Sequence, residues 1–311
     1  KDRGLYTIAL DQNPEAIAAK DADIFLTVQI SDGEKVLSAL VPYRERLKFV
    51  ATVATDFTHI VGYINDALKL TGPNFAQGKI LTHKGEMRNF CKTNGFLCPP
   101  FIVTQKKEDA ETWAKENPSE KGYVIKPAQN MGARGVMYLK RADELAFAFE
   151  FASTKDKKNE IILEHFIEAR EISVDALSFE GKVFLTGVAD RIIEIKDRHL
   201  FIETGHTLPG NFSSKEYTLI QNTMQRYADA LSSLSNKPYH GALKGDLRLT
   251  PQGELFIGEI AGRLSGGFMS THTYPAAHKK NLMQMFIRLM QHDASVILPY
   301  AESIQTKAFA I

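Results

Sequence analysis

The sequence predicts a mixed fold, in which an α/β layer at the N-terminus is followed by a larger α+β part. Apolar segments at 5–11 and 23–28 alternate with helical stretches, as in a parallel sheet covered by helices. After residue 78 short apolar strands with glycine turns predominate. The clearest hairpin lies at 242–260, where two apolar strands flank a Thr-Pro-Gln-Gly turn. A chain of 311 residues is long enough for two or three such units.

The composition excludes several classes of function. The net charge is +1 and 24% of the residues are charged, so we expect no nucleic-acid partner. We expect no membrane partner either, because no apolar run approaches the roughly 18 residues of a span and no signal peptide is recognised. Cys91 and Cys98 are the only cysteines and form no C-x-x-C motif, which favours a reducing, cytoplasmic location without a disulfide framework or structural zinc.

The N-terminal unit is expected to span residues 1–78. Strands are predicted at 5–11, 23–28 and 49–55, with helices at 33–46 and 57–70. A complete unit of this kind would have an earlier strand and a glycine-rich turn, so we expect this one to lack its first strand. A helix is predicted from 79 to 94, after the break at 71–74.

A glycine-rich loop follows a buried strand that carries Lys126. The loop, 129–136, has Gly132 and Gly135 on either side of Arg134, and the chain then returns as a strand. Such a loop is a hairpin tip and not the strand-to-helix turn of a Walker motif. Its backbone N–H groups can cradle phosphate oxygens, although most glycine-rich hairpins are simple turns.

Two further strands carry acids seven residues apart, Glu164 and Glu171. Glu164 lies in an apolar run, where a carboxylate needs a partner. A loop is predicted at 203–210 and a long amphipathic helix at 215–234.

The hairpin at 242–260 carries a carboxylate on each strand, Asp246 and Glu259. An antiparallel register can place both acids side by side, with Lys244 on the same face and Arg263 just beyond. Paired carboxylates with cations beside them suit a nucleoside triphosphate bound through magnesium. The alternative is a surface hairpin with solvated charges.

Taken together, these stretches resemble the ATP-grasp superfamily over nearly the whole chain. The nearest resemblance is to the carboxylate–amine ligase and carbamoyl-phosphate-synthase-like branch, because of the Arg-Leu-Ser-Gly-Gly run that starts at Arg263. It implies an ATP-grasp fold of class α/β + α+β. The implied units are a truncated α/β pre-ATP-grasp domain at 1–78, a small lobe at 79–160 and a large lobe at 161–311, with ATP between the lobes.

The resemblance also implies a role for each site residue. Residues implied to bind ATP are Lys84, Lys126, the loop Gly132, Ala133, Arg134 and Gly135, the adenine hinge Glu164, His165, Phe166 and Ile167, and Glu171 at the ribose. Asp246 and Glu259 would hold Mg²⁺ or Mn²⁺, and Lys244 and Arg263 would be the catalytic cations.

The implied activity is an ADP-forming ligase that activates a carboxylate as an acylphosphate for attack by an amine. Its partners would be these small-molecule substrates, and a homodimer is compatible with the family. One departure is Ala261, because many members have Asn two residues after the second metal carboxylate. Two alternatives therefore stay open: a carboxylating or other phosphate-activating enzyme, and a non-catalytic ATP-binding regulatory module. A dinucleotide-dependent oxidoreductase is not supported, because the chain has no G-x-G-x-x-G motif.

Overall fold

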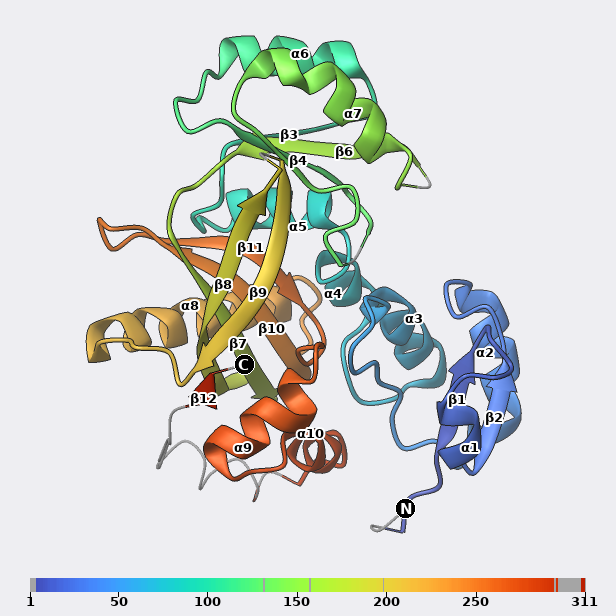
Figure 1. The fold of residues 1–311 in the computed structure, drawn as a ribbon. Coiled ribbons are helices and arrows are strands. Elements are labelled where there is room, and N and C mark those ends of the chain that lie inside the picture. Colours follow the sequence, from blue (N-terminus) through green and yellow to red (C-terminus); the bar gives the residue numbers. More distant parts are fainter. Residues whose placement is uncertain are drawn as a thin grey trace.

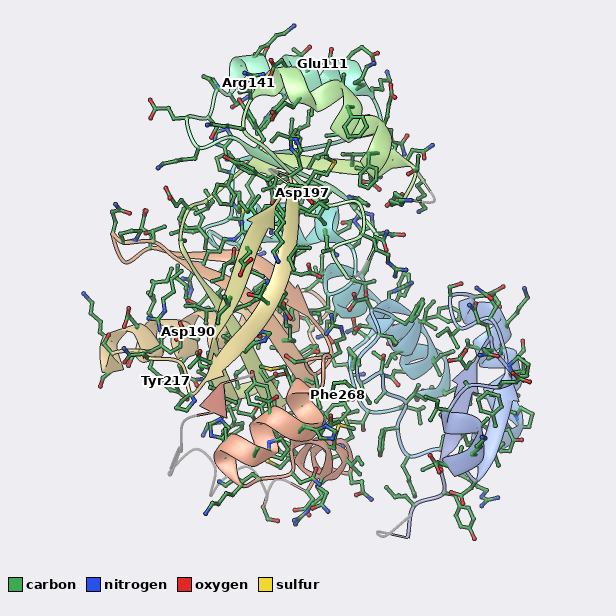
Figure 2. All side chains as sticks on the ribbon, viewed as in Figure 1. Glu111, Arg141, Asp190, Asp197, Tyr217 and Phe268 are labelled. Carbon is green, nitrogen blue, oxygen red and sulfur yellow. The ribbon has the colours of Figure 1, made fainter. Side chains whose placement is uncertain are left out.

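The computed structural model describes residues 4–130, 132–156, 158–197, 199–293 and 295, and the backbone of 309–310. These residues form a two-stranded, a four-stranded and a six-stranded sheet. The four-stranded sheet lies above the six-stranded one, and the N-terminal unit stands beside them (Figure 1). Glu111 and Arg141 lie on the outer side of the upper lobe, away from the junction between the lobes (Figure 2).

The N-terminal unit contains a small parallel sheet. Its elements are β1 (Ile8–Asp11), α1 (Ala18–Asp21), β2 (Ile24–Thr27), α2 (Gly33–Leu40), the 3₁₀ turn η1 (Val41–Tyr43) and α3 (Thr58–Leu68). The strand predicted at 49–55 is wrong, because only Phe49 makes an isolated bridge, to Thr71. The Thr52 hydroxyl donates to the Thr55 backbone carbonyl and also shares a hydrogen bond with the Thr55 hydroxyl. Such local side-chain bonds compete with the backbone pairing of a strand.

The helix predicted at 79–94 is two helices, α4 (Phe75–Ile80) and α5 (Lys84–Thr93). Asn74 begins α4 through a capping box with Gln77. His83 begins α5, since its Nδ1 accepts from the Glu86 N–H at 3.2 Å. The domain boundary predicted at 78 therefore falls inside α4 and is better placed between the two helices.

The small lobe is a four-stranded sheet covered by two helices on its outer face (Figure 1). Its elements are β3 (Phe101–Thr104), α6 (Lys107–Glu116), β4 (Tyr123–Pro127), β5 (Met137–Leu139), the 3₁₀ turn η2 (Ala142–Glu144), α7 (Leu145–Ser153) and β6 (Ile161–His165). The strand order is β3-β6-β4-β5. The boundary predicted at 160 is wrong, because β6 pairs with β3 and β4 at the centre of this sheet. The small lobe extends at least to His165.

The large lobe is built on the six-stranded sheet. Its elements are β7 (Arg170–Phe179), β8 (Lys182–Lys196), β9 (Leu200–Leu208), α8 (Ser214–Ser233), β10 (Gly241–Leu249), β11 (Leu255–Ala261), the π-helical turn η3 (Met269–Thr273), α9 (Tyr274–His278), α10 (Leu282–Met290) and β12 (Phe309–Ala310). The strand order is β11-β10-β7-β8-β9-β12. The loop predicted at 203–210 is wrong over 203–208, which continue β9 in pairing with β8.

Two apolar cores hold the large sheet in place. Residues of α5 and α8 pack on one face, and Tyr227 of α8 contacts both Phe90 and Phe96 there. Residues of α9 and α10 pack on the other face. The helices within the described ranges include none with the length and apolar character of a membrane span. The two cores together hold β7, β10 and β11 in place below the small lobe.

Candidate active site

A cavity of about 560 Å³ lies between the two lobes. Its lining comes from all three units: Asp56 precedes α3, Lys84 and Lys126 belong to the small-lobe side, and Asp246 and Glu259 belong to the large sheet. The volume is within the usual range of a small-molecule site. Its lining includes acidic and basic side chains from all three units, which suits a highly charged ligand.

Asp246 and Glu259 are direct cross-strand partners on β10 and β11. The prediction that both acids share a face is confirmed. The register shifts immediately beyond them, since Leu247 pairs with Ile257, so Gly258 is an extra residue in a β-bulge. A Cβ at Gly258 would lie 2.7 Å from the Asp246 carbonyl oxygen, so only glycine fits there.

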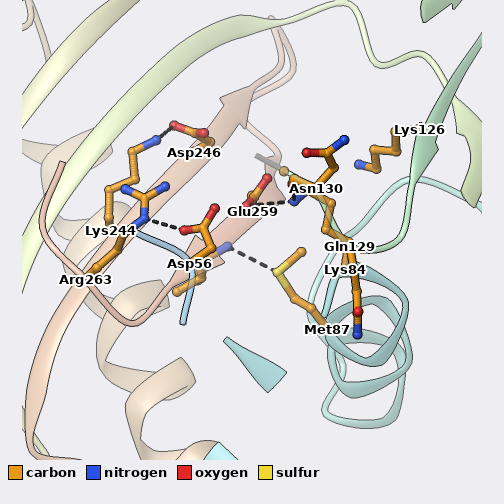
Figure 3. Close-up of polar contacts among 12 residues, drawn as sticks. Asp56, Lys84, Met87, Lys126, Gln129, Asn130, Lys244, Asp246, Glu259 and Arg263 are labelled. Carbon is orange, nitrogen blue, oxygen red and sulfur yellow. Dashed lines mark hydrogen bonds and ion pairs between the residues drawn. The ribbon is translucent and has the colours of Figure 1, made fainter. Parts of the chain in front are cut away.

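Cations hold both carboxylates in the charged form. Burial raises the pKa of Asp246, but Arg191 at 3.4 Å and the adjacent Lys244 outweigh it and lower that pKa well below its usual value. Burial also raises the pKa of Glu259, and Lys84 at 3.2 Å is the leading charge that reverses this effect. Figure 3 shows both carboxylates facing these lysines.

This pair of carboxylates fits magnesium. Mg²⁺ in nucleotide sites takes one or two carboxylates and completes its shell with phosphate oxygens and water. No third His, Cys, Asp or Glu gathers with them in the described ranges, so a site made of protein ligands alone is not formed there. Ala261 offers no side-chain amide oxygen, and it is buried.

Lys84 links Glu259 to the glycine-rich loop. It is at the start of α5, where its Nζ donates to the Asn130 carbonyl at 2.8 Å and contacts Glu259 (Figure 3). The base of the loop is tied by the Gln129 N–H, which donates to Asp156 at 2.9 Å. A movement of the loop would therefore act on the Glu259 carboxylate through Lys84.

Three residues of the glycine-rich loop have left-handed backbone conformations. Gly132, Ala133 and Gly135 all have positive φ, at 66°, 55° and 81°. Gly132, Ala133 and Arg134 line the cavity, whereas Gly135 is not among its lining residues. A Cβ at Gly135 would lie 2.8 Å from a side-chain carbon of Pro127, so this glycine serves packing. Met131 lies outside the described residues.

Lys126 and Glu164 form a buried ion pair at 2.7 Å on neighbouring strands β4 and β6. Arg88, on α5, also binds Glu164, at 2.8 and 3.3 Å. Burial raises the pKa of Glu164, but Arg88 and Lys126 together lower it to about 2. Burial and the charge of Arg88 lower the pKa of Lys126 to about 8, against the opposing effect of Glu164.

The segment predicted as an adenine hinge is already partly occupied. The Glu164 carboxylate is taken by the two cations, and it is not a free acid for a base edge. The His165 N–H donates to the Pro100 carbonyl and the Phe166 N–H to the Gly122 carbonyl, both at 3.0 Å. Neither side chain lines the cavity, and neither does Ile167. An adenine here would need other backbone groups of the segment.

Glu171 lies among arginines. Its carboxylate accepts from Arg248 at 2.7 Å and is 3.7 Å from Arg191, which also binds Glu203 at 2.6 Å. All four line the cavity. Arg191 therefore joins Glu171 to Asp246, and a charged network runs along the large-lobe wall.

Arg263 pairs with Asp56, from the segment before α3 (Figure 3). The two residues are 207 positions apart. The N-terminal unit thus supplies a carboxylate to the cavity, and the Thr58 hydroxyl also donates to the Gly262 carbonyl at 3.2 Å.

Four charged residues were missed or left open by the sequence reasoning. Arg248 alternates with Asp246 and Lys244 on one strand face, a local pattern that could have revealed it. Arg88 is four residues after Lys84 among the apolar residues of α5, an equally local sign. Asp56 and Arg191 have no such sign, because their partners are distant in the sequence.

Comparison with known proteins identifies the class of this fold. Residues 119–272 match the ATP-grasp domain family. The chain resembles the crystal structure of L-amino acid ligase from Bacillus licheniformis with a TM-score of 0.75, at 18% identity, over 93% of this chain and 69% of that one. Residues 119–272 thus match an ATP-grasp domain, and the predicted ATP-grasp fold is confirmed.

Sequence relatives include two ligases. The L-arginine-specific L-amino acid ligase of Bacillus subtilis is 23% identical over 215 residues, 67% of this chain and 49% of that protein. The D-alanine--D-alanine ligase of Geobacillus thermodenitrificans (strain NG80-2) is 27% identical over 230 residues, 70% of this chain and 56% of that protein. The chain thus spans about half the length of these relatives.

Proposed function

We propose that this protein is an ATP-dependent, ADP-forming carboxylate–amine ligase. The observation that carries the proposal is the cross-strand pair Asp246 and Glu259 in a cavity lined with lysines and arginines. The relatives that are named as ligases of amino acids support the same reaction class.

ATP would lie between the lobes. Asp246 and Glu259 would hold Mg²⁺ or Mn²⁺, which neutralises and orients the phosphate oxygens when bound. Lys84, Lys126 and the loop residues Gly132, Ala133 and Arg134 would surround the phosphates, and Gly135 would let the loop pack against Pro127. Glu171 would accept from the ribose hydroxyls, and the backbone of the 164–167 segment would bind the adenine edge.

In the proposed reaction a substrate carboxylate oxygen attacks the γ-phosphorus of ATP, and the bond to ADP breaks. An amine then attacks the carbonyl carbon of the acylphosphate and inorganic phosphate leaves. Lys244 and Arg263 would stabilise charge on the transferring group, which is the main way proteins accelerate phosphoryl transfer. The loop would keep water from the acylphosphate.

A cytoplasmic location is a further part of the proposal. Both cysteines are free thiols, Cys91 buried and Cys98 partly so, as expected for a protein of the reducing cytoplasm. The partners would be a small-molecule carboxylate and amine, and a homodimer is compatible with the proposal. Light scattering of the purified chain tests the assembly.

The deciding experiment measures ADP release with carboxylates and amines added separately and together. A ligase releases ADP at full rate only when both are present. Release that depends on bicarbonate would favour a carboxylating enzyme. Ala261 favours one rival, a module that binds ATP without turnover, and tight ATP binding with no ADP release under any substrate pair would support it.

A further inference from the structure

Arg88 is fully buried and yet holds a permanent charge. Its guanidinium points in two directions from α5. On one side Nε and Nη2 donate to the Glu164 carboxylate. On the other side Nη1 donates to the Ile257 carbonyl at 3.2 Å and Nη2 to the Gly258 carbonyl at 2.8 Å. One side chain thereby connects the small-lobe sheet to the large-lobe sheet.

The first set of contacts fixes a cation in the cavity. Glu164 shares its Oε1 between Arg88 and Lys126. With the carboxylate held from behind, the ammonium of Lys126 has one defined position at the cavity wall. Lys126 is the cation proposed for the ATP phosphates.

The second set of contacts fixes the metal carboxylate. β11 is an edge strand of the six-stranded sheet, and an edge strand leaves backbone groups without a neighbouring strand. Arg88 supplies donors to two of these carbonyls, at and just before the bulge residue Gly258. Glu259 follows directly, so the bulge determines where its carboxylate lies.

We propose that Arg88 is a positioning residue that sets the distance between Lys126 and Glu259. It holds Lys126 through Glu164 at one end and the bulge before Glu259 at the other. This inference rests on the proposed function, in which those two groups bind the phosphates and the metal of ATP. Mutation of groups that hold a metal ligand in place commonly costs about 10–100-fold in metal affinity or activity.

The charge of Arg88 gives a readout that a purely structural residue would not move. Four charged or titratable groups act on Lys126: Arg88 from α5, Glu164 from β6, Glu259 from β11 and Cys98 before β3. Burial and Arg88 lower the pKa of Lys126 to about 8. Binding of a triphosphate should therefore weaken as pH rises through about 8, where Lys126 loses its charge.

The experiment measures binding of the non-hydrolysable analogue AMP-PNP to the full chain between pH 6.5 and 10, over a range of Mg²⁺ concentrations. Arg88→Met removes the repulsion on Lys126, so the alkaline weakening should move to higher pH. Arg88→Lys keeps the charge and loses the two-sided fork, so the weakening should stay near pH 8 while about tenfold more Mg²⁺ is needed. Glu164→Gln removes the stabilising charge, so the weakening should move to lower pH.

Arg226→Met is the control, because Arg226 is exposed, lies over the Phe96 ring and does not line the cavity. It should leave both readouts unchanged. An alkaline weakening at the wild-type pH in Arg88→Met, or an unchanged Mg²⁺ requirement in Arg88→Lys, would overturn the inference. If Arg88→Met does not fold, Arg88→Lys and Glu164→Gln decide.

The two proposals fail in different ways. A wild-type chain that binds no AMP-PNP contradicts the proposed function itself. A wild-type chain that binds it with the expected pH and Mg²⁺ dependence, but never releases ADP with a carboxylate and an amine, contradicts the ligase reaction and leaves the role of Arg88 standing.

Discussion

The two walls of the cavity carry ion networks of different kinds. On the small-lobe wall the side chains of Arg88, Glu164 and Lys126 are 0%, 1% and 10% exposed. Arg88 and Lys126 both pair with the same carboxylate, that of Glu164. On the large-lobe wall Arg191 is 21% exposed and is shared among three acids. The comparison teaches that one network fixes a geometry, whereas the other can exchange partners when a ligand arrives.

The physical reason is the dielectric around each network. A buried charge that loses its partner cannot be solvated, so the small-lobe contacts persist with or without ligand. The large-lobe network is more exposed, with Arg191 at 21% and Glu203 at 45%, so we expect an arginine there to release a carboxylate to a ligand at a lower cost. Four predictions test this contrast, from the largest expected effect to the smallest.

Glu164→Ala should lower the free energy of unfolding by about 3–5 kcal/mol, because it leaves two buried cations without their carboxylate. The folded-state pKa of Glu164 is lowered to about 2, so its contribution is present above its ordinary pKa and is lost as pH falls toward 2. Urea unfolding at several pH values measures both effects. Glu150→Ala is the control, since Glu150 makes only an exposed 4.0 Å contact. A loss below about 1 kcal/mol would contradict a fixed network.

Glu259→Gln should lower ADP release by about 10²–10³-fold, as for removal of a main electrostatic group. The midpoint of thermal unfolding should change little, because the Glu259 side chain is 31% exposed where it pairs with Lys84 at the cavity wall. Asp246→Asn should behave alike. Steady-state assays and thermal melts measure the two effects, and full turnover by Glu259→Gln would remove it from the metal site.

Glu171→Gln should weaken ATP binding by about 1.5–3 kcal/mol, the usual worth of a hydrogen bond to a charged group. The wild type should bind ATP more tightly than deoxy-ATP, and the variant should lose most of that difference. Calorimetric titration with both nucleotides measures this, with Glu194→Gln as control because Glu194 lies outside the cavity lining. Equal binding of the two nucleotides by the wild type would rule out the ribose role.

Arg134→Ala should reduce turnover more than ATP affinity, because a loop contact that forms late in the reaction acts on the transition state. AMP-PNP with Mg²⁺ should protect residues 129–136 from hydrogen exchange, and ADP should protect them much less. Lys140→Ala, beyond the returning strand, is the control. Equal protection by the two nucleotides would favour the regulatory module over a closing loop.

The contrast also explains which parts were predictable from the sequence. The hairpin of Asp246 and Glu259 was predictable, because alternation and a tight turn are local properties. The strand predicted at 49–55 failed because Thr52 and Thr55 bond each other locally. The role of Arg88 depends on β6 and β11, which are distant in the sequence, and no pattern within α5 specifies them. The parts of the site that could not be predicted depend on contacts between residues far apart in the sequence.

The pair of Arg263 and Asp56 limits how the chain can be divided. A fragment that starts at α5 would contain Asp246, Glu259 and the lysines that line the cavity. It would lack the carboxylate that neutralises Arg263 and the hydroxyl of Thr58 that fixes the preceding backbone. The excised lobes would present a surplus positive charge at the cavity wall, and we expect them to bind phosphate, sulfate and other anions indiscriminately. We therefore expect the N-terminal unit to contribute to anion selectivity through Asp56, and we expect the two lobes to lose that selectivity without it.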